Sequence, residues 1–229
     1  TGEGWALETE DGVVMNGSKA EHIREAAAVI GQYCDVVGLR SFPGLQDRAR
    51  DYAEEVLNAF VSYAGIPVVN LESATVHPLQ SLADIMTIEQ YRGGSRPKVV
   101  LTWAPHPRAL PQSVANSFAQ WVGRMDYDLV IANPPGYDLS IDFTGSARVV
   151  HDPDEAYAEA DFVYAKSWSS YQQYGQVLST EARWMVDERK MALTNGAKFM
   201  HCLPVRRNMV VSDGVIDSGR PARGKPQGG

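Results

Sequence analysis

Residues 97–103 read Pro-Lys-Val-Val-Leu-Thr-Trp, a short apolar run that follows a Gly-Gly-Ser-Arg segment. Its length and its β-branched valines are typical of a buried strand. The apolar residues spaced along 113–125 predict a helix, and the Leu-Val-Ile-Ala run within 128–132 predicts a second strand. A strand, a helix and a strand in this order predict a parallel pair joined by a right-handed crossover.

The same alternation extends in both directions from this unit. Helical patterns cover 20–33, 47–65, 79–91 and 153–160, and apolar strands cover 35–39, 66–70, 162–165 and 198–202. We therefore predict an α/β protein with two parallel-sheet αβα domains. The segment at 93–97 is the expected boundary between a domain at 1–92 and a domain at 97–218. Residues 219–229 are basic and rich in Gly and Pro, which predicts a disordered or non-native tail.

The composition argues against several classes of partner. The chain has 229 residues, and 44% of them are hydrophobic, which is enough for a packed core. A net charge of −7 argues against a general nucleic-acid or membrane surface. Cys34 and Cys202 make neither a disulfide framework nor a metal-binding C-x-x-C pair, and no run of about 18 apolar residues is present. We expect a cytoplasmic protein that binds neither nucleic acid nor membranes.

Polar residues follow several of the predicted strands. In parallel sheets, ligands bind beyond the carboxyl ends of the strands. This rule selects five residues: Arg40, Glu72, His106, Lys166 and Cys202. We expect these side chains to surround a common site.

The stretch His77-Pro78-Leu79-Gln80 opens a predicted helix. Proline suits the first helical position because its fixed backbone and missing N–H are tolerated there. His77 and Gln80 then lie at the helix N-terminus, where free backbone donors favour anions. His77 could donate to a carbonyl oxygen and Gln80 could hydrogen-bond an amide. A capped helix with a buried histidine explains the same residues equally well.

The second motif, His-Cys-Leu-Pro-Val-Arg-Arg-Asn, occupies 201–208 directly after a predicted strand. Pro204 ends the ladder of the strand and leaves free backbone carbonyls that can accept from an –NH2 group. Cys202 is either part of that site or an inert buried thiol. Arg206 and Arg207 are either a solvated surface pair or an anion site.

Together, His-Pro-x-Gln-x-x-x-Asp and His-Cys-Leu-Pro resemble the aspartate/ornithine carbamoyltransferase family over about residues 5–218. The order and separation of the motifs fit that family as well. The resemblance implies two Rossmann-like domains. Residues 1–92 would be the C-terminal part of the carbamoyl phosphate-binding domain, incomplete at its N-terminus, plus an interdomain helix. Residues 97–218 would bind the amino acid, and neither a cofactor nor a metal is implied.

Variant segments resemble the N-acylornithine branch of the family. They are Trp5, Leu-Glu-Ser-Ala-Thr at 71–75, Thr-Trp-Ala-Pro-His-Pro at 102–107 and Ala-Lys-Ser-Trp at 165–168. The implied reaction moves the carbamoyl group of carbamoyl phosphate to the δ-amine of an N-acylornithine. The products would be N-acylcitrulline and phosphate, and the pathway arginine biosynthesis. An ornithine carbamoyltransferase is the alternative within the family.

The resemblance also implies roles for individual residues. Arg40, His77 and Cys202 would be catalytic. Trp5 would reach the phosphate site of a neighbouring subunit, which implies a homotrimer with shared active sites. The implied carbamoyl phosphate-binding residues are Trp5, Arg40, His77, Gln80, Cys202 and Leu203. The implied acylornithine-binding residues are Glu72, His106, Lys166, Trp168 and Arg206.

Ala20 bears on the acyl group. It falls where the acetylornithine type of enzyme carries Glu, and a carboxylate there would repel an anionic acyl tail. Alanine removes that repulsion and adds room, which favours N-succinyl-L-ornithine over N-acetyl-L-ornithine. The alternative is that Ala20 is simply a good helix-forming residue.

The family's phosphate-binding loop, Ser-x-Arg-Thr-Arg, is absent from these 229 residues. The resemblance is therefore to an interior fragment of a longer protein, and we expect little catalysis from the fragment alone. A non-catalytic binding paralogue that lost the loop is a second reading. A generic nucleotide-binding α/β domain is a third, but no glycines form a G-x-G-x-x-G or P-loop pattern.

Overall fold

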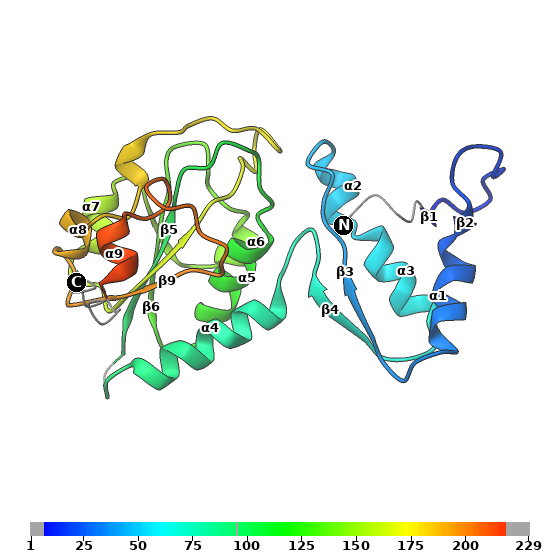
Figure 1. Cartoon of the computed structure of the whole chain (residues 1–229), viewed down its shortest axis with the longest axis horizontal. Coiled ribbons are helices and arrows are strands. Elements are labelled where there is room, and N and C mark those ends of the chain that lie inside the picture. The colour runs from blue at the N-terminus through cyan, green and yellow to red at the C-terminus, as the bar shows by residue number, and fades with distance from the viewer. Residues whose placement is uncertain (1–6, 95, 219–229) are drawn as a thin grey trace, which may run out of the picture.

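The computed structural model describes residues 7–94 and 96–218, and its larger sheet has five strands that are all parallel (Figure 1). Their order is β7-β6-β5-β8-β9, so the chain runs outward from β5 to β7 and then returns to the other side of β5. The switch point between β5 and β8 is where such sheets bind ligands. The strands are β5 (Lys98–Trp103), β6 (Asp128–Ala132), β7 (Arg148–Val150), β8 (Phe162–Lys166) and β9 (Lys198–Met200).

The central strand β5 confirms the prediction made from its apolar run. Val99, Val100 and Leu101 are completely buried because the sheet is covered on both faces. In Figure 1, α5 and α6 lie on one side of β5, and α7, α8 and α9 lie on the other. These helices are α5 (Ser113–Val122), α6 (Ile141–Thr144), α7 (Pro153–Tyr157), α8 (Glu188–Met191) and α9 (Asp213–Asp217).

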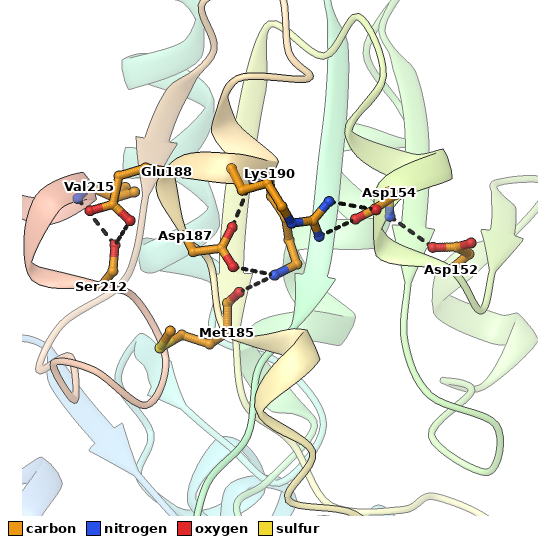
Figure 2. Close-up of polar contacts among 9 residues, drawn as sticks. Asp152, Asp154, Met185, Asp187, Glu188, Lys190, Ser212 and Val215 are labelled. Atoms are coloured by element: carbon orange, nitrogen blue, oxygen red, sulfur yellow. Dashed lines mark hydrogen bonds and ion pairs between the residues drawn. The ribbon is translucent and has the colours of Figure 1, made fainter.

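Polar contacts hold the short helices in place, as Figure 2 shows. Lys190 on α8 is 2% exposed, and its Nζ donates to the Met185 carbonyl at 2.8 Å and to Asp187 Oδ2 at 2.9 Å. Arg189 donates to both carboxylate oxygens of Asp154 on α7, each at 2.7 Å. A buried ammonium needs such partners because an unpaired buried charge is strongly destabilising. These contacts therefore fix α8 against its neighbours.

The first part of the chain forms a smaller parallel pair, β3 (Val37–Arg40) with β4 (Val68–Glu72). The helices α1 (Ile23–Gly31) and α3 (Glu55–Tyr63) pack together and share a small core centred on Phe60. A two-residue pair, β1 (Leu7–Glu8) with β2 (Glu21–His22), lies beside them. The α/β class with parallel sheets that the sequence predicted is confirmed.

Helix α4 (Pro78–Tyr91) connects the two sheets. It follows β4 of the smaller sheet and packs along α5 of the larger one. Its first turn matches the prediction from the His-Pro motif, because Pro78 occupies the start of the helix and His77 caps it. The side chains of this turn are thereby presented at the junction of the two halves.

Several predicted elements have other bounds in the structure; the helix expected over 153–160 ends at Tyr157, and the strand expected over 198–202 ends at Met200. The helix expected over 47–65 is two helices, α2 (Arg48–Tyr52) and α3, because Glu54 is left-handed with φ 50°. Its carboxylate accepts from the amide and the hydroxyl of Thr75, which holds that turn. The helix expected over 20–33 begins only at Ile23.

The strand expected over 66–70 is shifted by two residues, to Val68–Glu72. Glu72 therefore ends its strand instead of following it. Arg40 and Lys166 are likewise the last residues of β3 and β8. The expected residues still occupy the carboxyl ends of their strands, because a last residue and a following residue leave the sheet at the same edge.

Two predictions lie outside the described residues: the role of Trp5 and the nature of the tail at 219–229. Within the described part of the chain, no helix is long and apolar enough to cross a membrane.

Candidate functional site

The two sheets contribute to one cavity of about 560 Å³ at the junction of the two halves. A second cavity of about 370 Å³ shares Lys166, Cys202 and Leu203 with it, so the two cavities adjoin. The predicted residues that line one or both cavities are Arg40, Glu72, His77, Gln80, His106, Lys166, Cys202, Leu203 and Arg206.

Arg40 and Glu72 face each other across the smaller sheet because they are register partners in β3 and β4. Arg40 Nε donates to Glu72 Oε2 at 3.0 Å. The other carboxylate oxygen of Glu72 accepts from the Ser113 hydroxyl on α5 at 3.0 Å. Glu72 is 5% exposed and so forms a buried link between the two halves of the molecule.

His77 caps its helix and also lines the first cavity. Its Nδ1 accepts from the backbone N–H of Gln80 at 3.3 Å and caps α4. Burial lowers the pKa of His77, an effect that Glu72 opposes and the Arg40 charge supports. A neutral ring whose Nδ1 accepts must carry its proton on Nε2. That nitrogen lies 3.8 Å from Glu72 Oε2 and can donate to a carbonyl oxygen in the cavity.

The segment after β9 turns sharply at Leu203. His201 Nδ1 accepts from the Leu203 N–H at 2.9 Å, Leu203 is left-handed with φ 48°, and the Leu203–Pro204 peptide is cis. Burial raises the pKa of Cys202, so its side chain is a neutral thiol rather than a thiolate. Cys202 therefore offers a ligand its backbone carbonyl and a neutral thiol rather than a charged nucleophile.

The second cavity has a cationic wall. Arg206 Nε donates to His106 Nε2 at 3.0 Å, and Lys166 lines the same cavity. Burial lowers the pKa of His106, and the Arg206 charge adds to that effect. No Asp or Glu is among the described residues that line this cavity. The cavity can therefore neutralise a carboxylate of a ligand without competition from an acidic side chain.

Two predicted site residues do not reach these cavities. Trp168 is 2% exposed, and its indole donates to the Tyr137 carbonyl at 2.8 Å, so it belongs to the core of the larger sheet. Ala20 is exposed and precedes β2, which Figure 1 draws at the end of the molecule away from the larger sheet. Trp5 lies outside the described residues.

The structure adds residues that sequence reasoning missed. Phe42 and Ser113 line the first cavity, and Leu110 lines both. Only Phe42 carried a signal, since it follows a strand two residues after Arg40. Asp84 ends the His-Pro-x-Gln-x-x-x-Asp motif, and its carboxylate accepts from Gln80 Nε2 at 2.9 Å, a contact that the motif alone did not predict. Among the described residues, no three His, Cys, Asp or Glu side chains gather in a way that could hold a metal ion.

Comparisons with known protein families match both halves of the chain. The carbamoyl-P binding domain of aspartate/ornithine carbamoyltransferases matches residues 3–90, and the Asp/Orn binding domain of the same family matches residues 111–222. The N-succinylornithine carbamoyltransferase of Bacteroides thetaiotaomicron is 56% identical over 216 residues, which cover 93% of this chain and 68% of that protein. The N-acetylornithine carbamoyltransferase of Xanthomonas axonopodis pv. citri is 40% identical and covers 94% of this chain and 69% of that protein.

Solved structures give the same result. Acetylornithine transcarbamylase complexed with acetylcitrulline superposes with a TM-score of 0.87 at 40% identity, over 95% of this chain and 71% of that one. A glutamate-to-alanine variant of N-acetyl-L-ornithine transcarbamylase, complexed with carbamyl phosphate and N-succinyl-L-norvaline, has a TM-score of 0.88 at 40% identity, over 95% of this chain and 72% of that one. The predicted Rossmann-like carbamoyltransferase is confirmed, and the chain belongs to the aspartate/ornithine carbamoyltransferase family.

Proposed function

We propose that this chain forms the acceptor site of an N-acylornithine carbamoyltransferase that prefers N-succinyl-L-ornithine and serves arginine biosynthesis. The observation that carries the proposal is the cationic cavity of Lys166 and Arg206, which has no acidic side chain among its described lining residues. In this assignment residues 1–92 bind carbamoyl phosphate and supply the interdomain helix, and residues 97–218 bind the acylornithine.

The three possible acceptors differ in their charged groups. N-succinyl-L-ornithine has two carboxylates, N-acetyl-L-ornithine has one, and free ornithine adds a charged α-ammonium to its single carboxylate. Two cations in a cavity without acids suit two carboxylates, because charge-assisted hydrogen bonds are the strong ones. The α-ammonium of ornithine would be repelled by the same cations.

Carbamoyl phosphate fits the first cavity. The guanidinium of Arg40 and the Nε2–H of His77 donate to its carbonyl oxygen. The Cys202 and Leu203 carbonyls together accept one hydrogen of its –NH2 group, which leaves the second hydrogen for another acceptor. The neutral δ-amine attacks the carbonyl carbon, a C–N bond forms, the C–O bond to phosphate breaks, and the amine proton leaves with phosphate. Arg40 and His77 stabilise the negative charge that builds on the carbonyl oxygen. The reaction on this route needs only positioned hydrogen bonds.

Ala20 acts, in this proposal, on the active site of a neighbouring subunit of a homotrimer, as does Trp5. Ala20 lines neither cavity of its own chain, so a role in acyl selection requires a second copy. The complex of the glutamate-to-alanine variant with N-succinyl-L-norvaline supports the idea that loss of a carboxylate admits a succinyl group.

Two other readings are tested alongside. If free ornithine is the acceptor, the carbamoyl transfer is the same, but the protein is an ornithine carbamoyltransferase instead of a member of the N-acylornithine branch. A non-catalytic binding protein would share the fold of the family without its activity. The neutral His77 at the start of α4 and the cations Lys166 and Arg206 in the second cavity favour catalysis.

The first test offers carbamoyl phosphate with ornithine, N-acetylornithine and N-succinylornithine to the full-length product of the reading frame that encodes this chain. We expect the highest kcat/KM with the succinyl compound, measured as citrulline-type product. Higher kcat/KM with the acetyl compound would remove the succinyl preference, and turnover with ornithine alone would reassign the branch. If none of the three acceptors gives product, the non-catalytic reading is supported.

The second test replaces one arginine of the Arg-Arg pair at a time. Arg206→Met should lower kcat/KM for N-succinylornithine by about 10- to 100-fold, the effect of losing a charge-assisted hydrogen bond to a carboxylate. Arg207→Met is the matched control, because Arg207 pairs with Asp213 and Asp217 and does not line the cavity. An equal loss in both variants would contradict the assignment of Arg206.

A further inference from the structure

A buried carboxyl lies one helical turn behind the proposed carbamoyl phosphate site. Asp84 on α4 is 5% exposed, and its Oδ1 accepts from Gln80 Nε2 at 2.9 Å. No cation of the described residues forms an ion pair with Asp84 at 4.0 Å or less. Burial raises the pKa of Asp84 to about 6. A carboxyl in this environment destabilises the fold when it ionises, so its presence calls for a reason other than stability.

The chemistry of the Asp84 carboxylate determines which end of the Gln80 amide faces it. An ionised carboxylate only accepts hydrogen bonds, whereas a glutamine amide has a donor end and an acceptor end. The donor end, Nε2, must therefore face Asp84, which turns the acceptor end, Oε1, away from it. Gln80 lines the cavity that also contains Arg40 and His77, so its Oε1 is the atom available to a ligand there.

The second carboxylate oxygen of Asp84 has weaker hydrogen bonding than the first. Asp84 Oδ2 has no well-aligned hydrogen-bond donor among the described residues. The hydroxyl of Tyr164 on β8 nevertheless acts on the carboxyl and offsets part of the rise in its pKa. Tyr164 also interacts with Cys202, and burial raises the pKa of both groups, so both are neutral near pH 7. Among the described residues, the hydrogen bond with Gln80 is thus the one well-aligned side-chain contact of the Asp84 carboxyl.

We propose that Asp84 is a positioning residue that acts through Gln80: it holds the glutamine amide so that Oε1 accepts from the –NH2 group of carbamoyl phosphate. This inference rests on the proposed function and adds a residue to its machinery. An aspartate does this better than an asparagine, because an asparagine amide can pair with Gln80 in either orientation and does not select one.

A purely structural role makes the opposite prediction. If Asp84 served only to stabilise α4, Asp84→Asn would lower the melting temperature and leave ligand affinity unchanged in the folded protein. If Asp84 positions Gln80, the isosteric amide keeps or raises the melting temperature while the affinity for carbamoyl phosphate falls. Stability and affinity therefore move differently under the two roles.

The test is a double-mutant cycle in the full-length protein, with Asp84→Asn, Gln80→Ala and the two combined. Calorimetric titration with carbamoyl phosphate gives Kd without requiring turnover. We expect Asp84→Asn to raise Kd by about tenfold, as for one weakened hydrogen bond. In the Gln80→Ala background the same change should have no further effect, because non-additivity is the signature of two residues acting as one.

Ser81→Ala is the matched control, since Ser81 is 1% exposed on the same helix and its hydroxyl has no partner among the described residues. We expect its Kd and melting temperature to stay at the wild-type values. Equal effects of Asp84→Asn with and without Gln80 would overturn the positioning role and leave the proposed function intact. A wild-type protein that does not bind carbamoyl phosphate would overturn both.

Discussion

His201, which lies beside the site, is held neutral by its surroundings. Burial lowers the pKa of His201 to about 4, with the Lys166 charge contributing, and its Nδ1 accepts from the Leu203 N–H at 2.9 Å. Protonation would convert that acceptor into a donor and break the bond. The turn that presents the Cys202 and Leu203 carbonyls thus depends on a single neutral imidazole.

This dependence predicts acid sensitivity. In the unfolded chain His201 binds a proton near its ordinary pKa of 6.5, whereas the folded state resists protonation down to about pH 4. The unfolded state binds more protons between these values, so stability rises with pH through that window and falls on acidification, by up to about 3 kcal/mol. Urea unfolding from pH 7 to pH 4.5 measures it. His201→Asn should flatten this slope, while the same change at exposed His151 controls for the loss of a histidine.

At the scale of single elements, the smaller half depends on close helix packing. Gly31 is the last residue of α1, and a Cβ built on it would lie 1.9 Å from the carbonyl oxygen of Ala64, which follows α3. The backbones of the two segments can meet only because this position has no side chain. Helix propensity alone would favour alanine there by about 1 kcal/mol.

Packing should prevail over propensity at this position. We expect Gly31→Ala to destabilise the protein by about 1–3 kcal/mol, because a backbone oxygen at that distance forces α1 and α3 apart. Gly93→Ala is the control, since a Cβ there meets nothing within 4 Å. Chemical denaturation compares the two, and a stabilised Gly31→Ala variant would show that the α1–α3 contact is looser than described.

At the scale of the whole molecule, the two halves touch through polar and backbone contacts. Arg48 donates to the Tyr171 carbonyl at 2.9 Å, and the Tyr174 hydroxyl donates to Asp51 at 2.9 Å. Gly175 lies in the same segment, and a Cβ there would come 2.0 Å from the Leu45 carbonyl oxygen. These contacts set the distance between the sheets and hence the width of the cavity at their junction.

Widening this contact should impair activity more than folding. Gly175→Ala is expected to lower kcat/KM by about 10- to 100-fold, because displacement of reacting groups by about 1 Å has effects of that size. Gly196→Ala is a close control: φ is +66° there and +73° at Gly175, but a Cβ at Gly196 meets nothing within 4 Å. Both variants carry similar backbone strain, so a loss of activity confined to Gly175→Ala would isolate the contact between the halves. Equal activity in both would remove the contact from the mechanism.

Much of the fold could be predicted because hydrophobic periodicity reports local structure directly. The buried strand at 97–103 and the helix after His77 both lie where the pattern indicated. Strand β7 was missed because it has three residues, and two of them, Arg148 and Val149, are exposed. The break at Glu54 was missed because it depends on Thr75, which lies 21 residues away in the sequence.

The sequence by itself determined the alternation of strands and helices, the family motifs and the set of polar residues at the strand ends. These properties are local, so a periodic pattern or a short motif expresses them completely. Tertiary structure alone decided that Arg40 pairs with Glu72, that Arg206 rather than Arg207 lines the cavity, and that Trp168 is buried in the core. Each of these depends on residues far apart in the chain, whose proximity and charge environment exist only after the sheets have packed.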